Sequence, residues 1–273
     1  MDTRTPMALV TGASTGIGRE LARCLAQDGH DLLLTAENSQ VHDTAREMEQ
    51  LGVSVETVQV DLTEPDRVDE LAGRATATGR PIDALVLNAG VGAGGSFAGD
   101  TALTDQLRVV DVNVRSTVHL AKLLVPGMVE RGHGRVLFTS SIAATAPGPF
   151  LAVYNASKAF VQSFAQALRE ELRGTGVTVT SLLPGPTDTE FFDRARMRDT
   201  KIGSGPKDSA VTVARQGYAA MVAGRDSVIA GSRGNRVQVA ISRVMPERLV
   251  AAVHRRMSEP GTARSRRERI SSW

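Results

Sequence analysis

The sequence has 273 residues, of which 41% are hydrophobic and 23% charged, the composition of an ordinary globular protein. That length allows one large domain or two small ones, and no apolar run reaches transmembrane length. The single cysteine, Cys24, excludes an internal disulfide, and residues 1–6 lack the apolar core of a signal peptide, so we expect a cytoplasmic protein. The net charge is +2, and basic residues concentrate after Pro260, so we expect no nucleic-acid partner.

A glycine-rich loop follows the first predicted strand. Residues 7–11 form a short apolar run, and residues 19–28 have helical periodicity that ends at Gly29. Between them, Gly12, Gly16 and Gly18 have the spacing G-x-x-x-G-x-G. Glycines at a strand-to-helix turn let the backbone approach a pyrophosphate, and the helix start offers free N–H groups. An ordinary glycine turn is the alternative, but this context favours a dinucleotide site.

Strands and helices then alternate along the chain. Alternation of this kind predicts a Rossmann-type, doubly wound α/β fold, a parallel sheet of about seven strands covered on both faces. A ligand then belongs at the carboxyl ends of the strands, where Asp61 and Asn88 either bind it or cap the next helix. The further predicted strands are 31–36, 53–60, 84–87, 135–139, 177–183 and 227–230, and the helices are 39–51, 65–78, 103–129 and one beginning near Tyr154.

The chain after residue 231 has a different pattern. We expect residues 1–231 to form one catalytic, dinucleotide-binding domain with a substrate lid at about 188–210. Residues 232–259 have helical periodicity interrupted at Pro246, and this extension could pack on the body or lie on a partner or peripherally on a membrane. Residues 260–273 are predicted to be a disordered basic tail.

Tyr154 and Lys158 lie four residues apart at the start of a predicted helix, so their side chains share one face. A phenol with a pKa of about 10 is a poor acid or base at neutral pH, and a neighbouring ammonium lowers that pKa. A tyrosine tuned in this way can exchange a proton with an alcohol or carbonyl oxygen. Taken alone, the pair is more often an ordinary surface Tyr and Lys.

Several short motifs occur together in a recognisable order. They are Thr11 to Gly18, Asn88-Ala89-Gly90, Asn113, Ser141, Tyr154-x-x-x-Lys158 and Pro184-Gly185. With them the chain resembles the short-chain dehydrogenase/reductase family over roughly residues 7–230, and the segment from Pro184 to Phe191 resembles a ketoacyl-reductase-like bacterial branch.

The resemblance implies a role for each matching residue. Tyr154 would be the general acid/base, Ser141 would polarise the substrate oxygen, with Ser140 as the alternative, and Lys158 would hold the nicotinamide ribose. Asn113 would position a water in a proton relay, or would make only a polar contact at a helix kink. The residues implied to contact the cofactor are Gly12, Ser14, Thr15, Gly16, Ile17, Gly18, Glu37, Asp61, Leu62, Asn88, Ala89, Gly90, Tyr154, Lys158, Pro184, Gly185, Thr187 and Thr189.

The cofactor itself is NAD or NADP, and the sequence departs from the family pattern at the residues that choose between them. NAD users often have Asp at the position of Ala36, and NADP users often have a basic residue at the position of Glu37 or Thr15. Glu37 could accept hydrogen bonds from ribose hydroxyls and would repel a 2′-phosphate, so we favour NAD.

The function that the resemblance implies is an oxidoreductase that transfers a hydride between nicotinamide and a carbonyl or secondary alcohol. The alternative is a dinucleotide-sensing protein without turnover. Relatives pair through the helices around Asn113 and after Tyr154, so we expect a homodimer or homotetramer. The lid arginines at 194, 196 and 198 either meet an anionic substrate or form a solvated helix face, which we favour. The five histidines show no metal-ligand spacing, so no metal is expected.

Overall fold

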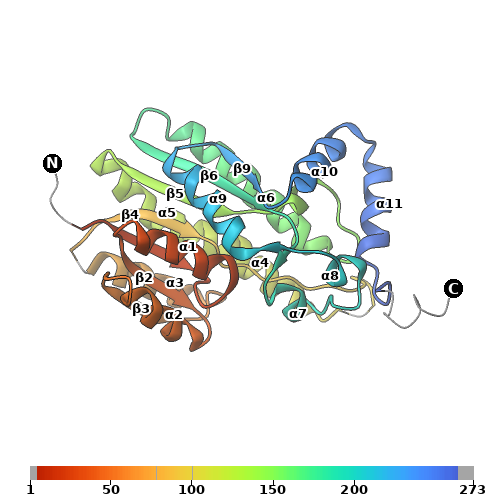
Figure 1. Ribbon diagram of the computed structural model, residues 1–273, viewed down its shortest axis with the longest axis horizontal. Helices are drawn as coiled ribbons and strands as arrows, with labels where there is room; N and C mark the ends of the chain where they lie inside the picture. Colours follow the sequence, from red (N-terminus) through yellow and green to blue (C-terminus); the bar gives the residue numbers. More distant parts are fainter. Residues whose placement is uncertain (1–4, 78, 100, 264–273) are drawn as a thin grey trace.

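A parallel sheet forms the centre of the computed structural model, which describes residues 5–77, 79–99 and 101–263 (Figure 1). Within these residues the sheet has seven strands, all parallel. Their order is β3 (Val55–Gln59), β2 (Asp31–Ala36), β1 (Met7–Thr11), β4 (Ile82–Leu87), β5 (Gly134–Thr139), β6 (Val177–Pro184) and β9 (Ser227–Ala230). The chain winds outward in opposite directions from β1 and β4, so a crevice opens at their carboxyl ends.

Helices cover both faces of this sheet. One face packs on α3 (Pro65–Ala77), α5 (Ser116–Arg131) and α6 (Ala152–Glu171), and the other on α1 (Gly16–Gln27), α2 (Gln40–Glu49) and α9 (Ala210–Val222). Because side chains alternate along a strand, Leu9 of β1 joins the first core while Ala8 and Val10 join the second. The predicted doubly wound α/β fold is confirmed.

The helix predicted over 103–129 is interrupted. The structure has α4 (Leu103–Val110), a π-helical turn at Asp111–Arg115, and then α5. Apolar periodicity predicts a continuous helix here, because a single π-helical turn is too short to have a periodicity of its own in the sequence. Asn113 lies inside this π-helical turn, and such turns often occur at functional sites.

Short elements form the lid region after β6. They are β7 (Thr187–Asp188), which pairs with β8 (Asp208–Ser209), and the one-turn helices α7 (Phe191–Arg194) and α8 (Lys201–Ser204). A 3₁₀ turn at Ile142–Thr145 leads from β5 toward α6.

The C-terminal extension forms two helices, α10 (Arg233–Val244) and α11 (Glu247–Ser258), separated at Pro246 as predicted. In the structure it packs on the body. Val239 of α10 joins a buried cluster with Ile142 and Leu183, and α11 lies against α8 (Figure 1). Gly261 and Ala263, expected in the disordered tail, donate hydrogen bonds to Asp199, and the tail after residue 263 lies outside the described residues. Among the helices described, none is both long and apolar enough to cross a membrane.

Candidate active site

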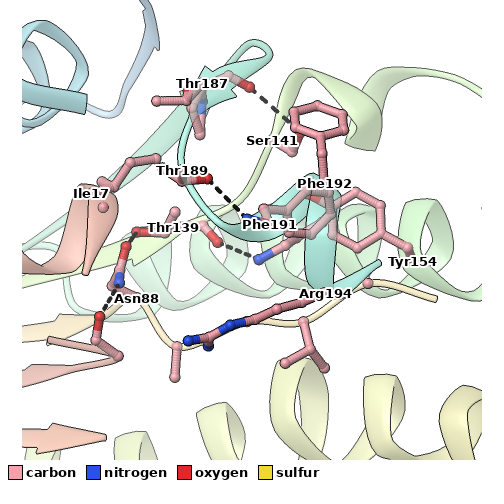
Figure 2. Close-up of a pocket in the computed structure, with 18 of the residues that line it drawn as sticks. Ile17, Asn88, Thr139, Ser141, Tyr154, Thr187, Thr189, Phe191, Phe192 and Arg194 are labelled. Carbon is pink, nitrogen blue, oxygen red and sulfur yellow. Dashed lines mark hydrogen bonds between the residues drawn. The ribbon is translucent and has the colours of Figure 1, made fainter. Parts of the chain in front are cut away.

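A cleft of about 260 Å³ runs along the carboxyl ends of the strands and under the lid (Figure 2). Every residue predicted to contact the cofactor lines it, as do Ser140 and Ser141, whereas Asn113 does not. The structure therefore brings together residues that the sequence separates by well over a hundred positions.

The glycine loop closes the end of this cleft near α1. Gly12 and Gly16 have φ angles of +65° and +58°, and a Cβ on Gly18 would lie 2.1 Å from the Gly12 carbonyl oxygen. Only glycine fits such backbone geometry. At the start of α1, Thr15 makes no side-chain cap, so the first N–H groups of the helix remain open to an anion. This cradle fits a dinucleotide pyrophosphate.

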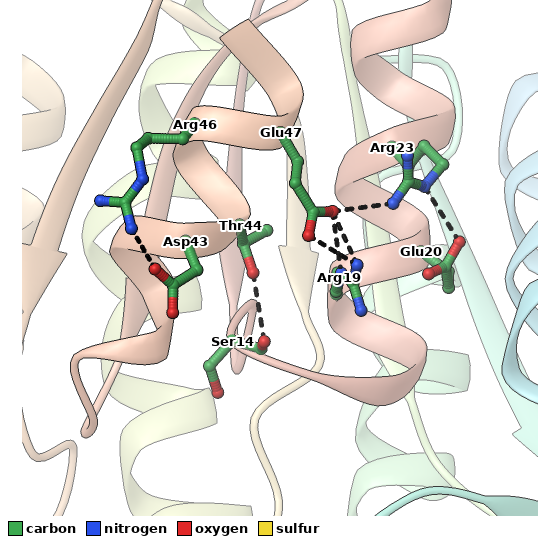
Figure 3. A network of polar contacts seen from close by, with 8 residues as sticks. All are labelled: Ser14, Arg19, Glu20, Arg23, Asp43, Thr44, Arg46 and Glu47. Atoms are coloured by element: carbon green, nitrogen blue, oxygen red, sulfur yellow. Dashed lines mark hydrogen bonds and ion pairs between the residues drawn. The ribbon is translucent and has the colours of Figure 1, made fainter. Parts of the chain in front are cut away.

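A polar network behind the loop holds it in place (Figure 3). Thr44 of α2 donates a hydrogen bond of 3.1 Å to the carbonyl oxygen of Ser14. Arg19, in the first turn of α1, reaches Glu47 of α2 with both Nε and Nη2, at 3.1 and 2.7 Å. The hydrogen bond from Arg19 lowers the pKa of the Glu47 carboxyl, although partial burial opposes it. The loop is thus fixed from the side opposite to the cleft.

Asn88 and Asp61 have structural partners at the strand ends. The amide nitrogen of Asn88 donates to the carbonyl oxygens of Thr11 and Gly12 at 3.1 and 3.3 Å, and its oxygen accepts from Thr139. Asp61 accepts from the Thr63 N–H at 2.9 Å and from Arg108 at 3.0 Å. Burial would raise the pKa of Asp61, but these hydrogen bonds outweigh it and lower the pKa. Both residues thus shape the strand ends that line the cleft.

Glu37 is paired with two arginines, Arg108, which sequence reasoning missed, and Arg194, which it assigned to the lid but not to Glu37. Arg108 of α4 donates to its carboxylate, and Arg194 of α7 lies 3.7 Å from it while donating to Glu190 at 2.6 Å. Figure 2 shows the Arg194 side chain extending along the cleft. Arg108 is 71 residues from Glu37, and no local pattern indicates the pairing. The charge of Glu37 is therefore partly compensated, which weakens the argument that it repels a 2′-phosphate.

Tyr154 projects into the cleft from the first turn of α6, with its ring 5.0 Å from that of Phe191. Burial raises its pKa to about 12, and a hydrogen bond with Ser141 opposes part of the increase. Lys158 is 5% exposed, its ammonium lies 5.9 Å from the centre of the Tyr154 ring, and burial lowers its pKa to about 8. The prediction that the ammonium lowers the phenol pKa is wrong for this structure, because desolvation dominates both groups.

The two serines after β5 face different partners. Ser140 donates to the carbonyl oxygen of Lys158 at 2.9 Å, which fixes the turn of α6 that carries the lysine. Ser141 accepts from the Ala143 N–H at 3.0 Å and lies beside Tyr154. Lys158 itself donates to the carbonyl oxygen of Thr139 at 2.9 Å. Ser141, rather than Ser140, is therefore the serine that forms a hydrogen bond with the Tyr154 side chain.

Asn113 lies beneath the cleft and not on its surface. Its amide oxygen accepts from the Val91 N–H at 2.8 Å, and its amide nitrogen donates to the Val91 carbonyl at 3.0 Å and to Ser157 at 2.9 Å. These contacts join the π-helical turn to the loop after β4 and to α6, the polar contact at a helix irregularity that we considered. The water relay implied by the family resemblance stays a prediction.

The lid and the C-terminal extension supply walls that sequence reasoning did not assign to the site. Leu151, Phe191 and Phe192 form an apolar cluster next to Tyr154, and Gln238, His254 and Met257 line the cleft from α10 and α11. Of the lid arginines, Arg196 and Arg198 are 79% and 77% exposed, as the solvated-face interpretation expects, whereas Arg194 lines the cleft. Helical periodicity predicted the extension but contains no signal for where it packs.

Comparisons with known proteins point to one family. Residues 6–200 match a family described as short chain dehydrogenase. The chain is 34% identical over 200 residues to the NADP-dependent 3-hydroxy acid dehydrogenase YdfG of Salmonella typhi, covering 72% of this chain and 79% of that protein. It is 40% identical over 187 residues to the glycine betaine reductase ATRR of Emericella nidulans, covering 68% of this chain but 15% of that protein.

A solved structure gives the same result for the fold. The short-chain dehydrogenase from Sphingobium yanoikuyae in complex with NADPH has a TM-score of 0.76 and 31% identity, with 82% of this chain and 87% of that chain covered. The family match ends at residue 200, before α10 and α11 begin.

Proposed function

The chain belongs to the short-chain dehydrogenase/reductase family and is an oxidoreductase, and we propose that Tyr154 is the general acid/base of hydride transfer between a nicotinamide cofactor and a carbonyl or secondary alcohol. The observation that carries this proposal is the position of the Tyr154 phenol in the cleft, beside Ser141 and one turn from Lys158. Bound nicotinamide supplies or accepts the hydride.

In the reducing direction, Tyr154 donates its proton to the carbonyl oxygen as that oxygen gains negative charge. Ser141 donates a hydrogen bond to the same oxygen and thereby polarises the carbonyl. Lys158 holds the ribose next to the nicotinamide, and its lowered pKa of about 8 lets it exchange a proton near neutral pH. Apolar side chains of Leu151, Phe191 and Phe192 exclude water from the reacting atoms.

The choice between NAD and NADP depends on the residues around Glu37, at the end of the cleft where the adenosine ribose would bind, which we call the adenosine end. We propose that NAD and NADP both bind and that Glu37 shifts the preference toward NAD, since its carboxylate can accept hydrogen bonds from ribose hydroxyls. Arg108 and Arg194 support binding of NADP, because each can pair with a 2′-phosphate instead of Glu37. The relative YdfG is named as NADP-dependent, and the Sphingobium structure contains NADPH.

The test is the Tyr154→Phe variant, assayed with a panel of ketones and alcohols and both cofactors. We expect loss of turnover and little change in NADPH binding, measured by the fluorescence of the reduced nicotinamide. Retained turnover would overturn the role of Tyr154. Cofactor binding without turnover of any substrate by the wild type would favour the alternative, a dinucleotide-sensing protein.

We also propose that copies of this chain associate into a homodimer or homotetramer. Leu103 and Leu107 of α4, Leu123 of α5 and Phe160 of α6 are exposed apolar side chains on the helices through which we expect copies to pair. Light scattering of the wild type and a Leu107→Asp variant would test this, and an unchanged mass in the variant would argue against pairing through α4.

A further inference from the structure

The cleft extends past Tyr154 to a wall that α11 builds. His254, Met257 and Ser258 of this helix line the same cleft as Tyr154 and Phe192, and Gln238 of α10 joins them. Ser258 is 4% exposed, and His254 and Met257 are partly buried. This wall lies near Tyr154, because α11 packs on α8, and Ile202 of α8 joins the apolar cluster that contains Tyr154 and Phe192. We call this the substrate end of the cleft.

Several contacts fix the wall to the lid. The side chain of Asp199, between α7 and α8, accepts from the Gly261 N–H at 2.8 Å, and its carbonyl oxygen accepts from the Ala263 N–H at 2.8 Å. Thr262 accepts from the Lys201 N–H at 3.2 Å. The Arg255 guanidinium lies 5.9 Å from the centre of the Phe150 ring. The residues after α11 therefore tie this helix to the lid, and both form one side of the substrate space.

The side chains that α10 and α11 contribute to the cleft carry little charge, since His254 is the titratable one among them. Elsewhere in the lining, among the described residues, the lysine and arginine side chains are those of Lys158, whose ammonium donates to the neutral carbonyl oxygen of Thr139, and Arg194. Arg194 is paired with Glu37 at the adenosine end and with Glu190. Burial lowers the pKa of His254, so this imidazole is neutral at neutral pH. A carboxylate or sulfonate bound against α11 would lose its hydration without gaining a cation from this helix, and the proposed function assigns the Lys158 ammonium to the cofactor ribose.

We propose that α11 is a specificity wall: Met257, together with the lid phenylalanines, holds the apolar body of an uncharged ketone or secondary alcohol, and His254 hydrogen-bonds an uncharged polar group on it. The inference rests on the proposed function and names the substrate class for the same site. It separates this chain from the relative YdfG, which is named for hydroxy acids. The family match does not include the wall, so the selectivity belongs to the extension.

Binding measurements test the wall independently of turnover. Isothermal titration of the enzyme–NADP complex would compare 2-nonanone, an uncharged ketone with an apolar chain, with acetoacetate, a small anionic ketone. We expect the wild type to bind 2-nonanone at least about tenfold more tightly. Met257→Ala should weaken 2-nonanone about tenfold with little effect on acetoacetate, because it removes the thioether arm that packs on the chain.

A His254→Arg variant adds a cation to the wall and should strengthen acetoacetate binding about tenfold relative to 2-nonanone. Arg256→Ala is the matched control, since Arg256 lies on the same helix but is exposed and does not line the cleft. Equal ratios of the two affinities in wild type, Met257→Ala and His254→Arg would overturn the proposal that α11 selects the substrate. Selective binding that follows these variants, combined with no turnover, would instead refute the proposed function and leave the wall intact.

Discussion

The two ends of the cleft differ in how they handle charge. At the proposed adenosine end, Glu37, Asp61, Arg108 and Arg194 are partly exposed and neutralise one another through ion pairs. At the proposed substrate end, Tyr154 packs against apolar side chains and Lys158 is buried, and burial moves their pKa values to about 12 and about 8. Pairing therefore governs the first end and desolvation governs the second, so substitutions at the two ends should have different consequences.

The largest effect is expected at the substrate end. Tyr154→Phe should reduce kcat by about a thousandfold, the scale of general acid–base catalysis, while leaving cofactor affinity nearly unchanged. Steady-state kinetics and nucleotide titration check this. Tyr218→Phe is the control, since Tyr218 lies on α9, packs on the opposite core and hydrogen-bonds Asp28. Similar activity losses in both variants would mean that the loss reflects folding and not chemistry.

The glycine loop at the adenosine end should not tolerate an added Cβ at Gly18. Gly18→Ala places a Cβ 2.1 Å from the Gly12 carbonyl oxygen, so we expect it to lower stability by about 2 kcal/mol or more and to weaken binding of both cofactors. Thermal unfolding with and without NADPH measures both effects. Gly73→Ala in α3 is the control, because its Cβ would meet nothing within 4 Å, and it should stabilise by up to about 1 kcal/mol. A stable Gly18→Ala protein with normal cofactor affinity would contradict the inference that the glycine loop binds the pyrophosphate of the cofactor.

The free energy of unfolding measured against pH tests whether desolvation shifts the pKa values of Lys158 and Tyr154. Burial lowers the pKa of Lys158 from 10.5 to about 8, so between these values the unfolded chain binds more protons and stability rises with pH. Burial raises the pKa of Tyr154 from 10 to about 12, so between those values the folded chain binds more protons and stability falls with pH. Urea unfolding from pH 8 to 10 should show the rise that Lys158 contributes, and Lys158→Met should remove that contribution. The control Lys122→Met, at an exposed position of α5, should leave the rise in stability unchanged.

The smallest effect concerns cofactor choice. Glu37→Gln removes the charge that Arg108 and Arg194 now share, so both arginines become available to a 2′-phosphate. The ratio of kcat/KM for NADPH to that for NADH should increase by about three- to tenfold. Glu49→Gln, at the exposed end of α2, is the control. An unchanged ratio would show that Glu37 does not choose the cofactor.

The same contrast explains what could be predicted from the sequence. The fold follows from alternating apolar patterns, and β1 and β2 begin and end at the predicted residues. The residues that line the cleft follow in large part from motifs at strand ends, because parallel strands bring those ends together. Arg108, His254 and Met257 could not be predicted, since their places depend on packing between segments far apart in the sequence. The direction of the Tyr154 pKa is predicted wrongly because the sequence contains the neighbouring charge but not the depth of burial.

The parallel sheet has a kinetic consequence. The central strand β1 pairs with β4 through Met7 and Ile82, so the cleft exists only after a long stretch of chain has been closed into a loop. Contacts of such long sequence separation slow folding, and the dinucleotide cradle should be completed late, after the rate-limiting step. Cofactor added during refolding should therefore leave the folding rate nearly unchanged and slow unfolding instead, so that the bound protein persists longer once assembled.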